Sequence, residues 1–384
     1  MSGFTVDCAA VDFDLSADQL ALRDAAAGLL DAKAGHDALR ARVGPGSVVG
    51  RDAAAPQGYD EAVWSAMAEQ GWLALEVPEE EGGLGLGLVE VAVLCEEIGR
   101  RLVAAPFLSS MVALGALRSP EAQADDVTAA WREALAGGAA VGCVALAPGG
   151  LEVEPSCADG PVRLRGTTPP AAYAPSADVA VVVTSDGVYG VDLGTSGRPA
   201  PLPAMDRTRE LGSLAFDGTL AHPLGGADAA DLVLDRAAVL AGAEMLGAAD
   251  HVLAMTVQYA KDRVQFGKPI GSFQAVKHML ADALVDVEGM RSTAYYAAWC
   301  AAADDADRSL AASMAKGWCS EASRRVMAAG LQVHGGIGFT WEHDMHLYLK
   351  RAQLDQVSYG DAAFHRDRIA GILRGRLDAG QALW

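Results

Sequence analysis

Two glycine-bearing segments in the C-terminal half carry the residues best suited to bind a phosphorylated ligand. The first, YAKDRVQFGKPIGSFQAVKHMLAD (259–282), has the pattern of a helix end, a turn and a new helix. Arg263 would lie near the end of the first helix, and its planar guanidinium matches pyrophosphate oxygens in pairs. Phe266 offers an apolar face to a ring system, and Gln274 in the first turn of the next helix can donate or accept. The plain alternative is a helix–turn–helix in which Arg263 only caps a helix.

The second segment is GLQVHGGIGFTWEHDMHLYLKRA (330–352), in which a helix ends at a run of glycines. Gly335, Gly336 and Gly338 follow Gln332 at this point. Because glycine has no side chain, a ligand can approach the backbone amides closely. Taken alone, the segment is better explained as a glycine-rich helix stop.

Two further patterns carry less chemistry. GGLGLG (82–87) is superficially similar to a dinucleotide loop, but that motif follows a strand and opens a helix. Here PEEE precedes it, so we predict a glycine turn between helices. His343 and His346 lie three residues apart without a further ligand at a defined spacing, and Asp344 would point elsewhere on a helix. We therefore predict no metal site.

The elements that must position these segments fall into three parts, which predict an α+β fold. Residues 1–135 have helical patterns, and Ser16 and Gln19 could form a capping box at the first helix. Residues 136–228 contain short β-prone runs separated by Gly, Pro and Asp, typical of a small antiparallel barrel or sandwich. Residues 229–384 predict a C-terminal four-helix bundle. Its expected helices lie near 233–263, 272–303, 307–330 and 343–376.

Composition excludes several functions. The chain has 384 residues and a formal net charge of −20, whereas nucleic-acid binding requires clustered Lys and Arg. No apolar run reaches the roughly 18 residues that a membrane span requires. The first residues, MSGFTVDCAAVDFDLS, lack the basic region of a signal peptide. The six cysteines are scattered without a CxxC pair, which favours reduced thiols in a cytoplasmic protein.

Together the two C-terminal segments resemble the acyl-CoA dehydrogenase family. WSAMAEQGWLALEVPEEEGGLGLGLVEVAVLCEEIGR (64–100) is similar to that family's first helical domain. Ala177–Val179 and Met205–Thr208 resemble stretches of its β-domain. The resemblance covers residues from about 10 to 376. It implies FAD bound across a subunit interface. The residues that would contact the pyrophosphate and adenosine side of a flavin held mainly by the neighbouring subunit are Arg263, Phe266, Gln274, Gln332, Gly335 and Gly336.

The resemblance also implies α,β-desaturation of an acyl-CoA thioester, in which a carboxylate removes the α proton and the flavin receives hydride. The family's usual Tyr-Glu-Gly run is here Tyr359-Gly360-Asp361, so glycine stands where the base would be. Asp361 is one position further on, which would turn its side chain by about 100° in a helix. Other members place the base before an arginine on an earlier helix, where this chain has Asp235. Asp235 is equally explained as an ordinary acid near a helix N-terminus.

Two stretches of the β-domain also depart from the family pattern. ALAPGGLEVEPSCADG (145–160) replaces a Thr-Glu-Pro and Gly-Ser-Asp stretch that lines the flavin ring and the substrate. TTPPAAYAPSAD (167–178) replaces an aromatic-Ile-Thr element. The chain is therefore expected to hold its own isoalloxazine poorly while it can still contact a neighbour's flavin.

Three functional interpretations follow. The preferred one is a subunit of a heteromeric α2β2 acyl-CoA dehydrogenase whose homologous partner brings the glutamate, with electron-transferring flavoprotein as acceptor. The run Tyr359–Asp361 and the trailing Phe364–Arg366 resemble subunits of such enzymes, including those that act on steroid side chains. The second is a self-sufficient enzyme with Asp235 or Asp361 as base. The third is a non-catalytic scaffold or acyl-binding protein, because fold alone does not settle function.

Overall fold

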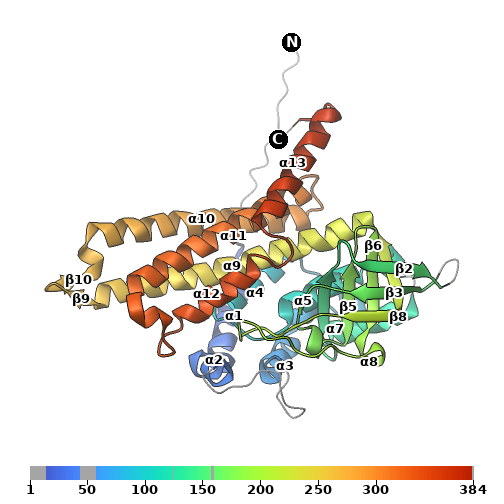
Figure 1. The fold of residues 1–384 in the computed structure, drawn as a ribbon, viewed down its shortest axis with the longest axis horizontal. Coiled ribbons are helices and arrows are strands. Elements are labelled where there is room, and N and C mark those ends of the chain that lie inside the picture. Colours follow the sequence, from blue (N-terminus) through green and yellow to red (C-terminus); the bar gives the residue numbers. More distant parts are fainter. Residues whose placement is uncertain (1–13, 44–57, 124, 157–159, 383–384) are drawn as a thin grey trace.

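The computed structural model describes residues 14–43, 58–123, 125–156 and 160–382. Within these ranges the chain passes from helices through a small sheet to a second set of long helices, as the sequence predicts (Figure 1). The N-terminal residues 1–13 and Cys157 lie outside the described ranges. Four described cysteines, Cys95, Cys143, Cys300 and Cys319, are free and buried.

The N-terminal part is helical, and its first helix begins where the sequence predicts. In α1 (Ala17–Lys33) the Ser16 hydroxyl accepts from the Gln19 amide, and the Gln19 side chain accepts from the Ser16 amide. The 3₁₀ turn η2 (Glu79–Glu81) and the glycines of 82–87 precede α4, so GGLGLG is a turn between helices. The other helices of this part are α2 (His36–Val43), α3 (Glu61–Glu69), α4 (Leu88–Arg100), α5 (Phe107–Ala116), α6 (Pro120–Gln123) and α7 (Asp126–Ala136).

The central sheet is small, open and mixed. Its strands are β1 (Gly142–Leu146), β2 (Leu151–Pro155), β3 (Val162–Thr167), β5 (Val179–Val183), β6 (Gly187–Asp192) and β8 (Ala215–Gly226), in the order β1-β5-β6-β8-β3-β2. All neighbours are antiparallel except β1 and β5, which run parallel. The long strand β8 pairs with β3 through its first half and with β6 through its second half. The sheet thus differs in detail from the expected small antiparallel barrel or sandwich, because it is open and β5 pairs in parallel with β1 after a long connection.

The C-terminal part contains three long helices that pack against one another, α9 (Ala227–Asp262), α10 (Gln274–Ala302) and α11 (Arg308–His334). The predicted last helix is in fact two, α12 (Met345–Asp355) and α13 (Ala362–Asp378). The break falls at Tyr359 and Gly360, whose φ angles of 59° and 95° are left-handed and end a right-handed helix. Figure 1 shows α13 projecting from the bundle.

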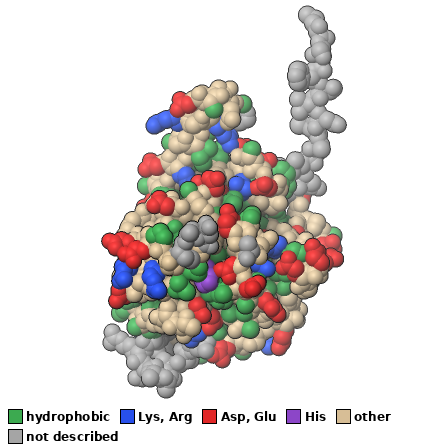
Figure 2. Space-filling model, turned by 90° about the vertical axis from the view of Figure 1, so that its right-hand side faces the viewer, with side chains coloured by type: hydrophobic (Ala, Val, Ile, Leu, Met, Phe, Trp, Pro, Cys, Tyr) green, Lys and Arg blue, Asp and Glu red, His purple; other side chains and the backbone are tan. Residues whose placement is uncertain are grey.

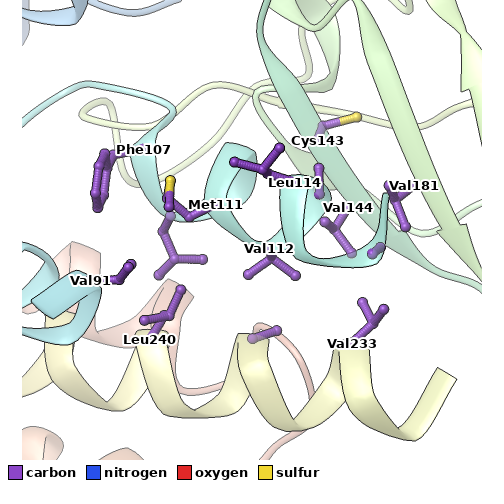
Figure 3. Close-up of a cluster of buried hydrophobic side chains, with 14 of the residues drawn as sticks. Val91, Phe107, Met111, Val112, Leu114, Cys143, Val144, Val181, Val233 and Leu240 are labelled. Carbon is purple, nitrogen blue, oxygen red and sulfur yellow. The ribbon is translucent and has the colours of Figure 1, made fainter. Parts of the chain in front are cut away.

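Helix α9 packs against elements of all three parts. Figure 3 shows one buried cluster drawn from all of them: Val91 of α4; Phe107, Met111, Val112 and Leu114 of α5; Cys143 and Val144 of β1; Val181 of β5; Val233 and Leu240 of α9. Helices α4 and α9 approach most closely at Gly99 and Gly247. A Cβ at either position would collide with a backbone carbonyl of the other helix, so glycine is required there.

The surface reflects the net charge. Asp and Glu side chains spread over the face in Figure 2 and are more prominent there than Lys and Arg. Within the described ranges, no helix is long and apolar enough to cross a membrane.

Candidate active site

The first predicted segment lies at the outer end of the bundle. Arg263 caps the C-terminus of α9, the hairpin of β9 (Val264–Gln265) and β10 (Lys268–Pro269) follows, and Gln274 opens α10. The Phe266 ring, at the hairpin turn, is 92% exposed. Its φ of 52° is an uncommon conformation for a residue with a bulky side chain. Backbone strain of this kind is frequent at ligand-binding and catalytic sites.

The second segment ends α11 at the same end of the bundle. Gly335 terminates the helix with φ 64°, and η5 (Gly335–Phe339) follows. Gln332, Gly335 and Gly336 are exposed. A Cβ on either glycine would meet no atom within 4 Å, so the space above this turn is open.

The two segments are brought together by aromatic side chains. The ring of Tyr259, one helical turn before Arg263, stacks on the ring of His334 with centroids 4.5 Å apart. In Figure 1 the β9–β10 hairpin and the bend between α11 and α12 lie at the same end of the molecule. Residues about 70 positions apart in the sequence therefore form one exposed surface, which we call the bundle tip.

The turn that matches the family's catalytic run is built for glycine. A Cβ at Gly360 would overlap the ring of Phe364, and its φ is 95°. The sequence comparison considered Asp361 as part of a helical turn, but the structure places it outside the helix. It is the N-cap of α13, and its Oδ1 accepts a hydrogen bond of 2.8 Å from the Phe364 amide. That carboxylate thus stabilises a helix start.

A buried lysine donates hydrogen bonds to the backbone of this turn. The Lys316 ammonium, fully buried on α11, donates to the carbonyl oxygens of Gly360 at 2.8 Å and Gln356 at 3.2 Å, and to Ser320 Oγ at 3.0 Å. Burial lowers the pKa of Lys316 to about 8. Nothing in the sequence pattern indicated this lysine, because two of its three acceptors are backbone carbonyls some 40 residues away.

Asp235 lies in the third turn of α9, eight residues after the helix begins, and is 1% exposed. Its Oδ2 accepts from Ser309 Oγ at 2.6 Å, and its Oδ1 pairs with Arg368. It lines a cavity of about 940 Å³ together with leucines of α4, α5 and α9 and the ion pair of Arg236 with Glu76. The cavity can accommodate an apolar group, but both oxygens of Asp235 are already engaged.

A second buried cluster, which the sequence did not reveal, joins the sheet part to the bundle. We call it the arginine cluster: Asp206, Arg209, Glu244, Arg351 and Asp355. All five are at most 8% exposed. Arg351 donates to Asp206 at 2.8 Å and pairs with Glu244, and Arg209 bridges Glu244 and Asp355. Its members are up to 149 positions apart, so local patterns could not find it.

Two tyrosines border the arginine cluster from the segments that depart from the family pattern. Tyr173 belongs to the 167–178 stretch and is 2% exposed, and Tyr359 precedes Gly360. Burial raises the pKa of both hydroxyls, and the charges of Arg209 and Glu244 act on both. The side chains of Arg209 and Glu244 therefore lie near both tyrosines, one from the 167–178 stretch and one from the 356–361 turn.

Sequence and structure comparisons agree with this architecture. Residues 16–123 match the acyl-CoA dehydrogenase N-terminal domain, and residues 225–373 match the acyl-CoA dehydrogenase C-terminal domain. The acyl-CoA dehydrogenase IpdE2 of Mycobacterium tuberculosis is 37% identical over 335 residues, which cover 86% of this chain and 89% of that protein.

Solved structures give the same result. The ChsE4–ChsE5 complex from Mycobacterium tuberculosis superposes with a TM-score of 0.84 at 29% identity, covering 94% of this chain and 99% of that one. A variant of the Tcur3481–Tcur3483 steroid ACAD gives the same TM-score, identity and coverage.

The chain belongs to the acyl-CoA dehydrogenase family. Its members are oxidoreductases that act on the CH–CH group of acyl-CoA thioesters, and FAD is their cofactor. The bundle tip carries groups of the kind that a phosphate-bearing ligand requires. Arg263 is exposed with no carboxylate partner among the described residues, Phe266 presents a bare ring, and Gly335 and Gly336 leave their backbone open.

Proposed function

We propose that this chain is one subunit of a heteromeric FAD-dependent acyl-CoA dehydrogenase and completes the FAD site of a homologous catalytic subunit. The observation that carries the proposal is the contrast within one chain. Arg263, Phe266 and the Gly335–Gly336 turn are exposed and unoccupied by other side chains. At position 360 there is no carboxylate, and the turn around it is fixed in a form that excludes one.

Each side chain at the bundle tip then has a defined task. Arg263 binds the pyrophosphate through paired N–H donors, and Phe266 covers the adenosine side. Gln332 and the amides near Gly335 and Gly336 orient the same half of the cofactor. When bound, FAD accepts the β hydrogen as hydride. The partner's carboxylate takes the α proton, and the reaction is α,β-desaturation of an acyl-CoA, with a steroid side-chain thioester as one candidate substrate.

The relatives support a partner of this kind. The ChsE4–ChsE5 structure is a complex of two proteins, and this chain superposes on one of its chains over 94% of its length. We propose an α2β2 assembly in which the bundle tip of this chain contacts the partner. Electron-transferring flavoprotein is the proposed acceptor.

Asp235 and Asp361 are assigned structural tasks in this proposal. Asp361 caps α13, and Asp235 is held by Arg368 and Ser309 at the base of the cavity. A general base must reach the substrate with a free lone pair. The self-sufficient interpretation would require Asp235 to leave this ion pair.

The test is to record visible spectra of the chain alone and of the chain co-expressed with a homologous acyl-CoA dehydrogenase subunit. The expected result is a colourless chain alone and a yellow complex that acyl-CoA bleaches. Arg263→Ala should remove the colour from the complex, whereas Arg165→Ala in the sheet part should leave it. Flavin that acyl-CoA bleaches in the chain alone would refute the proposal in favour of a self-sufficient enzyme. No flavin in either preparation would refute it in favour of a scaffold.

A further inference from the structure

Three rings pack together beneath the bundle tip, and two of them, Tyr259 and His334, are stacked. His334 is the last residue of α11 and lies between Tyr259 of α9 and His343 of the loop before α12. The centroids of His334 and Tyr259 are 4.5 Å apart at an interplanar angle of 26°, and those of His334 and His343 are 4.4 Å apart. One imidazole therefore contacts two other segments of the tip.

The central ring is fixed in one orientation. His334 is 4% exposed, and its Nδ1 donates to the Gly330 carbonyl oxygen at 2.7 Å. Its Nε2 has no hydrogen-bond partner among the described residues. Burial lowers the pKa of His334, which favours the neutral ring. A neutral ring can stack on Tyr259 without a buried charge to solvate.

The stack is placed directly below the residues proposed to contact FAD. Tyr259 precedes Arg263 by one helical turn, and the Tyr259 carbonyl accepts from the Arg263 amide at 2.9 Å. His334 immediately precedes Gly335, where the backbone becomes left-handed. The contact of these two rings therefore joins the Arg263 segment to the glycine turn.

We propose that His334 is a positioning residue for the cofactor contacts: through its stack on Tyr259 it holds the Arg263 segment and the Gly335–Gly336 turn at the spacing that one FAD molecule requires. This inference rests on the proposed function, because it assumes that the tip contacts FAD. His334 itself touches no cofactor. A displacement of about 1 Å in a positioned group can have a large effect. We therefore expect loss of this ring contact to weaken FAD binding.

The molecule offers a matched control on the same helix. His251 of α9 stacks on Tyr348 of α12 with centroids 4.9 Å apart and an interplanar angle of 15°. Burial lowers the pKa of this histidine as well. The His251–Tyr348 pair has the same chemistry but joins no two segments of the tip, so its loss should affect stability without affecting FAD.

The experiment measures FAD affinity by flavin fluorescence in the complex with the homologous subunit, and the thermal midpoint of the same complex without FAD. His334→Ala is expected to weaken FAD binding about tenfold, whereas His334→Phe, which keeps a ring, stays within about twofold of wild type. His251→Ala should also stay within about twofold. Tyr259→Ala should match His334→Ala, and the double variant should lose no more than either single one.

The possible outcomes distinguish the positioning role of His334 from the proposed function. A wild-type complex that binds FAD, with His334→Ala unchanged, would overturn the positioning role alone. Equal losses in His334→Ala and His251→Ala, parallel to their thermal midpoints, would also overturn it, since the effect would then be general stability. A wild-type complex without FAD would overturn the proposed function and this inference with it. If His334→Ala does not fold, the comparison of Tyr259→Ala with Tyr259→Phe decides in its place.

Discussion

The bundle tip and the 356–361 turn differ in whether their polar groups are exposed or hydrogen-bonded within the chain. At the tip, the Arg263 guanidinium, the Phe266 ring and the Gly335–Gly336 turn are exposed, and the Phe266 ring contacts only the edge of Phe273 among the described rings. At the turn, Lys316, the Gly360 carbonyl and the Asp361 carboxylate satisfy one another or the backbone. Exposed donors without a protein partner are available to a ligand, whereas a satisfied turn requires none. This contrast supports the proposed role of the chain as a subunit that completes a partner's FAD site.

The largest effect is expected in the arginine cluster, which anchors α12 just before the turn. Arg351→Leu leaves Asp206 buried without a cation and leaves Glu244 with Arg209 alone, and should lower the free energy of unfolding by about 3–5 kcal/mol. Urea denaturation of the chain measures it. Arg366→Leu is the control, because Arg366 pairs with Glu321 at the surface, and its unfolding midpoint should not change. Equal stability of Arg351→Leu and wild type would mean that the cluster does not anchor the turn.

Next is the pH dependence of the same cluster. Burial raises the pKa of Asp355 to about 6, above the ordinary 3.8. The folded chain thus binds this proton more tightly than the unfolded chain, so the contribution of Asp355 to stability is full below pH of about 4 and declines as pH rises to about 6. Over that window wild type should lose about 2 kcal/mol relative to Asp355→Asn. Denaturation at several pH values checks this, and parallel profiles would exclude Asp355 as the group responsible.

Gly360→Glu tests whether the missing base can simply be replaced. The new side chain must adopt φ near 95° and displace Phe364, at a cost of about 1–3 kcal/mol. We expect a destabilised chain that remains inactive towards acyl-CoA without a partner. Gly360→Ala separates the backbone cost from the carboxylate, and should show a similar loss of stability. Activity in the chain with Gly360→Glu alone would contradict the division of tasks between subunits.

The sequence predicted the two regions unequally, for physical reasons. The helix end at Arg263, the turn at Phe266 and the helix start at Gln274 depend on neighbouring residues, so local patterns were sufficient. The absence of the family's usual glutamate, with Gly360 in its place, was also evident from the sequence. The partners of Lys316 and Arg351 were not, because they lie tens to hundreds of positions away and include backbone carbonyls.

The sheet and the last helix show the same limit. Alternating β-prone runs predicted strands, but not that β1 pairs in parallel with β5. The run 343–376 was predicted as one helical stretch, yet left-handed Tyr359 divides it. A non-glycine residue with positive φ gives no signal in its own identity. Tertiary contacts decide it, here those of Lys316 and the α13 cap.

The smallest expected effect concerns the shape of the cation at the tip rather than its charge. Arg263→Lys keeps the positive charge but loses the planar fork that engages two phosphate oxygens, so FAD affinity of the complex should fall about tenfold, or about 1.4 kcal/mol. Because Arg263 is exposed, the thermal midpoint of the FAD-free complex should not change. Lys268→Arg, in the same hairpin, is the reverse substitution at a neighbouring cation and should leave affinity unchanged. If Arg263→Lys binds FAD as well as wild type, the tip attracts the cofactor through charge alone, and the paired hydrogen bonds to its pyrophosphate are not made.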